Sequence, residues 1–260
     1  MESTPDGPLP RIAADGRMPM QVYAAGFDPS DQRPKVGLIL AGIGLNGADS
    51  QDATNNLPGG ITFALSPYAQ ISPDLLAKIR LAEHEYLLSL PMEPQSFPLN
   101  DPGDKALLTR NTPEENEQRM RWALSRFAGY VGVTGALGSM RGERFAKASY
   151  AFDPVLHELS ARGLLYADPR PDAGKLPSVW QRRVDVIIDD RPDDASIDSK
   201  LGELDRLAAE RGSALGLAGA VRPETIARIA AWANELPAKG LALAPVSALA
   251  VAPPATEPTQ

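Results

Sequence analysis

Short apolar runs alternate with helical patterns along most of the chain. The candidate strands are three to five residues long and apolar on successive positions rather than on alternate ones. They are Val36–Leu40, Ile61–Leu65, Tyr86–Leu90, Val131–Val133, Leu164–Tyr166, Val184–Ile188, Ala214–Leu217 and Leu241–Ala244. Continuous apolar runs of this kind are typical of strands in a parallel sheet that is covered on both faces.

Helix-start signals fall between these strands. Ser72-Pro73-Asp74 combines a capping residue with a first-turn proline, and Thr112-Pro113-Glu114-Glu115 has the pattern of a capping box. Asp153-Pro154, Ser196 and Pro223-Glu224 open three more amphipathic segments. This βαβα alternation predicts an α/β fold with a parallel sheet. Eight candidate strands favour a closed or nearly closed (β/α) barrel, and an open doubly wound sheet is the alternative.

The two ends of the chain differ from its middle. Residues 1–34 hold six prolines with little periodicity, which predicts a Pro-rich N-terminal tail. Residues 251–260 predict a flexible C-terminal tail. A single domain is therefore expected over residues 35–250.

Composition excludes several classes of function. The chain has 33 acidic and 26 basic residues, a net charge of −7, and no basic block, so nucleic acid and anionic membrane are poor partners. It has no cysteine and two histidines, His84 and His157, which excludes thiol catalysis and a three-histidine zinc site. No apolar stretch is long enough to span a membrane. No signal peptide is visible, which indicates a cytoplasmic protein if the start is genuine.

A glycine-rich turn follows the first strand. Gly42-Ile43-Gly44-Leu45-Asn46-Gly47 fits the G-x-G-x-x-G pattern of dinucleotide sites. The residues after it are polar and lack a helical apolar period, and no acidic residue lies about 20 positions further on to hold a ribose. The sequence therefore favours a plain turn, and no cofactor is expected from it.

Polar candidates lie beside three other strands. His84, just before Tyr86, is either a metal ligand or base, or a hydrogen-bonded structural histidine. The run from Asp189 to Asp194 follows an apolar strand and would suit either a magnesium ion or the start of a helix. Asp168-Pro169-Arg170 follows the strand Leu164–Tyr166 in the same way.

Nine segments, taken together, resemble the divergent polysaccharide deacetylase family in family order. They are KVGLILAGIGL (35–45), LPGGITFALSPY (57–68), HEYLLSLPMEP (84–94), PGDKALLT (102–109), GVTGALGS (132–139), GLLYAD (163–168), VDVIIDD (184–190), RPETI (222–226) and LAPVSAL (243–249). HEYLLSLPMEP is the most specific of them. The resemblance implies a distorted (β/α) barrel of about seven to eight parallel strands.

The functional positions of that family are largely lost. Its first strand normally ends in an aspartate pair, and here the matching residues are Ala41 and Gly42. Three of its histidines match Ala136, Ala220 and Ser89. A family member would use a divalent metal such as zinc, which needs about three protein ligands. The resemblance therefore implies a degenerate site, with no metal ligand and no cofactor in this chain.

The resemblance also implies what the remaining polar residues do. A remodelled hydrolase would use His84, Glu93, Asp168 and Asp189 for catalysis and Ser139, Arg170 and Asp190 to bind substrate. A non-catalytic barrel would instead bind a polysaccharide or peptidoglycan-type glycan, or an envelope protein, and this second reading is favoured. The family location is the periplasm or cell envelope.

Two geometric expectations follow from the barrel. Asp168, Asp189, Gly42 and His84 are expected at one end, because loops that carry function gather at the carboxyl ends of parallel strands. The lost ligand positions are expected to point into a solvated cleft. Restoring aspartate at Ala41 and Gly42 and histidine at Ala136 and Ala220 is then expected to create zinc affinity without harming the fold.

Overall fold

The computed structural model describes residues 1–254 and contains one curled parallel sheet. Its nine strands follow the order β8-β7-β6-β5-β4-β3-β10-β9, and β11 pairs with β3. The strands are β3 (Lys35–Ile43), β4 (Thr62–Leu65), β5 (Tyr86–Ser89), β6 (Gly132–Thr134), β7 (Leu165–Asp168), β8 (Gln181–Arg183), β9 (Val186–Ile187), β10 (Ser213–Ala218) and β11 (Ala242–Leu243). All eight predicted strands are confirmed, with boundaries that differ by a few residues.

The sheet closes on itself through one extended segment. β8 pairs with β7 in parallel, and β9, which begins three residues after β8 ends, pairs with β10 in parallel. The backbone N–H of Val184 donates to Asp168 on one side, and that of Asp185 donates to Leu215 on the other. Residues 181–188 therefore join the two edges, and the fold is a distorted (β/α) barrel rather than an open sheet.

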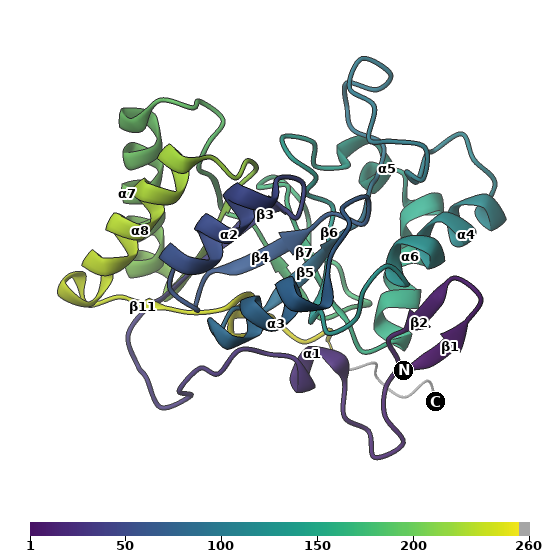
Figure 1. Cartoon of the computed structure of the whole chain (residues 1–260), viewed down its shortest axis with the longest axis horizontal. Helices are drawn as coiled ribbons and strands as arrows, with labels where there is room; N and C mark the ends of the chain where they lie inside the picture. The colour runs from purple at the N-terminus through teal and green to yellow at the C-terminus, as the bar shows by residue number, and fades with distance from the viewer. Residues whose placement is uncertain (255–260) are drawn as a thin grey trace.

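Helices surround the barrel on most sides. They are α2 (Gly47–Asn56), α3 (Pro73–Leu81), α4 (Pro113–Leu124), α5 (Glu143–Lys147), α6 (Ser149–Ala161), α7 (Asp194–Arg211), α8 (Pro223–Glu235) and α9 (Val246–Leu249). α7 and α8 flank one side of the sheet, and α4 and α6 flank the other (Figure 1). None of the helices within residues 1–254 is both long and apolar enough to cross a membrane.

The helix α2 is absent from the sequence prediction. Its residues are polar, but Asn46 caps it by accepting hydrogen bonds from the backbone of Ala48 and Asp49. Only small side chains, such as Ala53 and Ser50, face the core. A helix with so narrow an apolar stripe has little periodicity for a sequence pattern to reveal.

Apolar side chains of the strands alternate between two core clusters. On β3, Val36, Leu38 and Leu40 pack outward against the helices, whereas Ile39 and Ala41 face the barrel interior. The register of β3 against β4 shifts between Ala41 and Ile43, where Gly42 has a φ of 91°. A bulge of this kind needs glycine and turns the end of the strand toward the barrel mouth.

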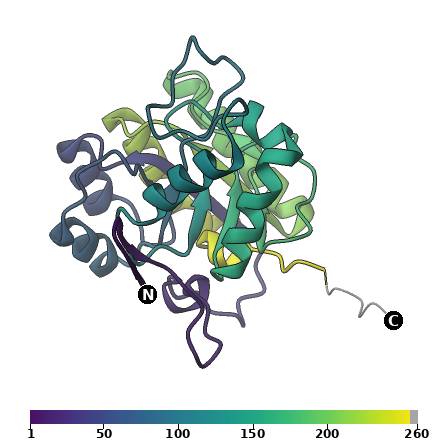
Figure 2. The same cartoon turned by 90° about the vertical axis from the view of Figure 1, so that its right-hand side faces the viewer.

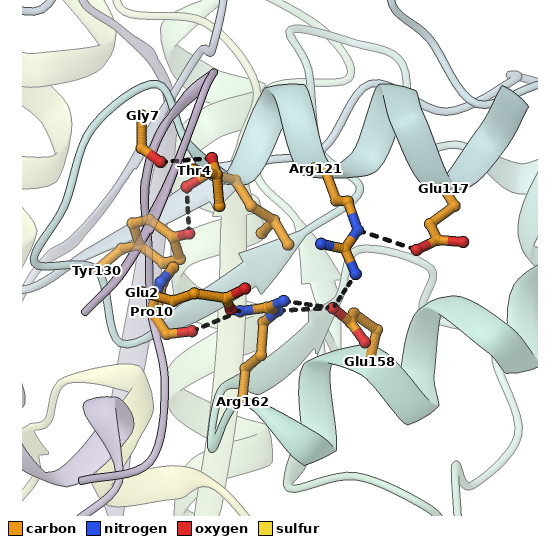
Figure 3. A network of polar contacts seen from close by, with 10 residues as sticks. Glu2, Thr4, Gly7, Pro10, Glu117, Arg121, Tyr130, Glu158 and Arg162 are labelled. Atoms are coloured by element: carbon orange, nitrogen blue, oxygen red, sulfur yellow. Dashed lines mark hydrogen bonds and ion pairs between the residues drawn. The ribbon is translucent and has the colours of Figure 1, made fainter. Parts of the chain in front are cut away.

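Residues 1–34, expected as a tail, contain a hairpin and a short helix. The hairpin β1–β2 (Glu2–Thr4 and Gly7–Leu9) packs beside α4 and α6, and α1 (Pro19–Val22) lies near the amino ends of the strands (Figures 1 and 2). Arg162, at the end of α6, bonds the Glu2 carboxylate at 3.0 Å and the Pro10 carbonyl at 2.9 Å (Figure 3). Leu9 is 1% exposed. The hairpin is therefore anchored to the barrel by charge and by burial.

A buried carboxylate ties distant segments together at the amino end of the barrel. Glu85 accepts hydrogen bonds from Thr62, from the backbone of Ala25, and from both the backbone and the hydroxyl of Ser247. Its burial raises the pKa of the carboxyl. Val251 also pairs with Gln181 as an antiparallel bridge. The flexible C-terminal tail expected from residue 251 lies outside the described residues from residue 255 onward.

Candidate functional site

The carboxyl ends of the strands gather three of the predicted residues. Asp168 is the last residue of β7, Asp189 follows β9 by two residues, and Gly42 forms the bulge near the end of β3. The loop between β5 and α4 stands above this end, opposite α1 (Figure 1). His84 precedes β5 and therefore lies at the amino end. The expectation that it joins the others is wrong, because a residue before a strand lies at the opposite end from one after it.

Glu93 holds the long loop that follows β5. Its carboxylate accepts hydrogen bonds from the backbone N–H and the hydroxyl of Thr109, at 2.6 and 2.7 Å. The Arg144 guanidinium pairs with the other carboxylate oxygen at 3.2 Å. The Glu93 side chain is only 5% exposed. The carboxylate is thus occupied by protein donors that tie the two ends of this loop together.

Asp168 and Arg170 form one buried unit. Nε and Nη2 of Arg170 donate to the two carboxylate oxygens of Asp168 at 2.9 and 2.7 Å, and the Arg170 backbone N–H adds a third bond. The Arg170 guanidinium also lies over the ring of Phe152. Both side chains are less than a tenth exposed. A bidentate pair of this kind fixes both side chains and engages both carboxylate oxygens.

Asp189 and Asp190 face different partners. Asp189 accepts hydrogen bonds from the backbone N–H groups of Gly219 and Ala220 at 2.8 to 3.0 Å, so it fixes the loop after β10. Asp190 is exposed and pairs with Arg141 at 3.4 Å, which links the loop after β9 to the loop after β6. Asp190 is the predicted acid with the greatest access to solvent at this end.

Close contacts between glycine-containing loops narrow the mouth of the barrel. A side chain on Gly219 would meet the carbonyl oxygen of Gly138 at 2.6 Å, and one on Gly135 would meet the end of Met92 at 2.5 Å. Ser139, predicted to bind substrate, is exposed on the same loop as Gly138. The loops after β6 and β10 therefore touch across the mouth.

His84 is a structural residue at the amino end. Its Nδ1 lies 2.8 Å from the Ile61 carbonyl oxygen, so Nδ1 carries the proton and donates it. The ring stacks on Phe63 at 4.0 Å and is 1% exposed. Burial lowers the pKa of this imidazole. Of the two alternatives that the sequence left open for His84, this arrangement matches the hydrogen-bonded structural histidine.

This burial predicts acid sensitivity that depends on one residue. The folded protein keeps His84 neutral, while the unfolded chain protonates it as the pH falls below 6.5, so this stability is present above pH 6.5 and lost below it. We expect the free energy of unfolding to fall between about pH 7 and pH 5, more steeply in the parent than in His84→Phe. Urea denaturation at several pH values measures it.

The matched control is His157→Phe, because His157 is exposed on α6. This variant should keep the parent's pH slope. Equal slopes for all three proteins would contradict the assignment of the acid sensitivity to His84.

A family model for divergent polysaccharide deacetylases matches residues 38–250. The chain belongs to this family. No curated protein matches the chain.

Two solved structures are similar to this family member. An uncharacterized protein from Agrobacterium tumefaciens C58 shares 31% identity at a TM-score of 0.86, over 94% of this chain and 99% of its own. The catalytic domain of peptidoglycan N-acetylglucosamine deacetylase from Eubacterium rectale ATCC 33656 shares 13% identity at a TM-score of 0.51, over 85% of this chain and 91% of its own. The second likeness shows a shared fold.

The residues at the metal-ligand positions of the family do not fit a metal ion. Ala41 and Ala136 are fully buried and lie in the core cluster of the barrel interior, and Gly42 has no side chain. Ser89 is fully buried, and its hydroxyl has no partner among residues 1–254. No group of three His, Asp or Glu within those residues could hold a metal ion. The expectation of a solvated cleft at Ala41 and Ala136 is therefore wrong, because both pack inside the barrel.

A groove of about 510 Å³ lies beside the mouth of this deacetylase-like barrel, and the sequence did not indicate it. It runs between the end of β9 and the start of α7. Its polar lining comes from Asp190, Arg191, Ser196, Ser199 and Lys200. The last three follow the i, i+3, i+4 spacing of one helix face, which the sequence does contain. In contrast, no pattern in the sequence near Glu93 indicates that its carboxylate is bound by Thr109 and Arg144.

Proposed function

We propose that this protein binds a glycan of the cell envelope without deacetylating it. The observation that carries the proposal is the state of the acids at the carboxyl end of the barrel. Glu93, Asp168 and Asp189 are each held by two or more protein donors, and the metal-ligand positions of the family are filled by alanine, glycine and serine. A protein with this arrangement keeps the family fold but lacks the groups for its chemistry.

The missing groups decide which chemistry is available. Hydrolysis of an acetamide requires a water molecule made nucleophilic by a metal or a base, and a donor for the developing oxyanion. A base must have a free lone pair within reach of that water. The Asp168 carboxylate points its two oxygens at Arg170, and Asp189 points its two at backbone N–H groups. Binding without turnover is what such a site can still do.

The groove between β9 and α7 supports glycan as the ligand. Sugars are recognised by convergent hydroxyl, carboxylate and amine groups, and this groove offers Ser196, Ser199, Asp190 and Lys200. It lies at the end of the barrel where ligands bind in this architecture. One structural neighbour, the catalytic domain of a peptidoglycan N-acetylglucosamine deacetylase, supports an acetamido sugar of the envelope as the chemical class. We place the protein in the periplasm or envelope accordingly.

The test measures acetate release and binding on the same protein. We expect no acetate above the blank from acetylated chitooligosaccharides or peptidoglycan, and less than a tenth of an equivalent of zinc, nickel or cobalt by elemental analysis. The protein should nevertheless sediment with purified peptidoglycan. The variant Ser199→Trp, which fills the groove from an exposed helix position, should sediment at least about fivefold less.

Three outcomes would overturn the proposal. Acetate release that disappears in Asp168→Asn would establish the remodelled hydrolase instead. Equal sedimentation of the parent and Ser199→Trp would mean that the groove does not bind the glycan. Failure to sediment at all, together with capture of an envelope protein that Ser199→Trp does not capture, would replace the glycan by a protein partner.

A further inference from the structure

A second groove, of about 430 Å³, runs along β8 and is separate from the groove beside α7. One wall is the segment 173–177, and the other is the segment 251–254. The Gln181 side-chain amide exchanges two hydrogen bonds with the backbone of Leu176, at 2.7 and 3.0 Å. The Gln181 backbone exchanges two more with Val251, at 2.8 and 3.0 Å. Both walls are thus fastened to the strand that forms the floor.

The lining of this groove is basic in an acidic protein. Among residues 1–254, its lining includes Lys175, Arg182 and Arg183 and contains no aspartate or glutamate, although the chain has a net charge of −7. Arg182 is neutralised by Asp185, whose carboxylate lies 2.6 Å from its Nη2. Lys175 and Arg183 make no ion pair with any acid among residues 1–254. Within the described part of the chain, two cations on one lining therefore have no acidic partner.

Arg183 is the more informative of the two cations. Its side chain is half-buried, and Nη1 donates to the Ala173 carbonyl at 2.8 Å, which fixes the guanidinium against the wall of the groove. A charge that is partly removed from water without a counterion is costly. A fixed guanidinium on the same lining as an exposed ammonium is a donor set that binds planar or tetrahedral oxyanions.

We propose that this groove binds the negatively charged group of a sugar, a carboxylate or a phosphate. This inference deepens the proposed function, on which it rests, by naming an anionic glycan. The positions of the two grooves agree with it. Arg183 ends β8 in register with Asp168, and only two residues separate it from β9, whose end leads into the groove at Asp190. The two grooves are thus joined by a short segment of chain, residues 183–190.

The binding test uses three related sugars. N-acetylmuramic acid carries a carboxylate, N-acetylglucosamine 1-phosphate carries a phosphate, and N-acetylglucosamine is neutral. By isothermal titration at low ionic strength we expect at least one charged sugar to bind the parent protein about tenfold or more tightly than the neutral one. That preference should shrink as salt is added, since exposed charges are screened. Which charged sugar binds identifies the source of the anion.

Two double variants with the same change in net charge locate the site. Lys175→Gln with Arg183→Gln should remove the preference for the charged sugar. Lys78→Gln with Arg206→Gln, which neutralises two exposed cations on α3 and α7, should leave the preference as in the parent. Thermal unfolding of both variants should match the parent within a few degrees, which shows that each is folded.

The outcomes separate this inference from the proposed function. Equal affinity of the parent for all three sugars, or the same loss in both double variants, would overturn the anion site. Sedimentation with peptidoglycan would then still stand on the groove beside α7. A preference for a charged sugar that depends on Lys175 and Arg183, in a protein that does not sediment with peptidoglycan, would support the anion site and leave the envelope glycan without support.

Discussion

The substitution Ala136→His, which restores a family histidine, is expected to destabilise the protein by about 2–6 kcal/mol rather than create a metal ligand. Ala136 is fully buried in the core cluster of the barrel interior. An imidazole there overpacks the interior at about 1–3 kcal/mol and buries a polar group without a partner at about 1–3 kcal/mol. Urea denaturation followed by circular dichroism measures the loss.

The matched control is Ala220→His, the same change at a half-buried position on the loop after β10. This variant should stay within about 1 kcal/mol of the parent, as surface substitutions do. The quadruple variant combines Ala41→Asp and Gly42→Asp with Ala136→His and Ala220→His. It should not fold, because Ala41 is buried and the φ of 91° at Gly42 strains any side chain. A folded quadruple variant that binds zinc by titration would show that the mouth opens more readily than its packing implies.

Replacing Glu85 by alanine is expected to cost about 3–5 kcal/mol, a large part of the stability of a domain this size. The carboxylate accepts four hydrogen bonds, from Ala25, Thr62 and Ser247. Its loss leaves these donors in a buried site without acceptors. It also frees the segment before β3 and the short helix α9 from the barrel. Equilibrium unfolding and hydrogen exchange of the Ala25 and Ser247 amides measure both effects.

A second variant, Glu85→Gln, and a control, Glu210→Ala, show whether the loss comes from the hydrogen bonds of Glu85. Glu85→Gln retains the volume and one acceptor oxygen, so it should lose less stability than Glu85→Ala. Glu210→Ala removes an exposed acid that pairs with Arg206 on α7, and should cost less than about 1 kcal/mol. A loss of less than 1 kcal/mol in Glu85→Ala would mean that these hydrogen bonds add little to the packing around them.

Sequence periodicity predicted the strands of the barrel because buried parallel strands are marked by unbroken apolar runs. It missed β8, since Gln181, Arg182 and Arg183 are polar and pair through their backbones. It also missed the hairpin β1–β2, whose attachment depends on Arg162, more than 150 residues away along the chain. Contacts of this kind leave no mark in local sequence.

The candidate site was predicted in part for a related reason. Asp168 and Asp189 follow strands in the sequence, which correctly predicted that they lie at the carboxyl end of the barrel. His84 precedes a strand, and the same rule places it at the amino end. The state of each acid could not be read in advance, except for Asp168, whose partner Arg170 is two residues away. Glu93 is saturated by Thr109 and Arg144, which a single sequence does not connect to it.

The first strand of the barrel, β3, is paired on both edges only when the last strands are present. β3 pairs with β4 on one edge, and β11 pairs with the start of that same edge at Lys35 and Val36. The other edge of β3 is completed only by β10, with Lys35 opposite Ser213. A chain that leaves a ribosome or a translocation channel amino end first must carry β3 with an open edge until nearly all of its residues have emerged. We expect such a chain to depend on chaperones during that interval, and a truncation before β10 to yield an aggregating fragment rather than a smaller barrel.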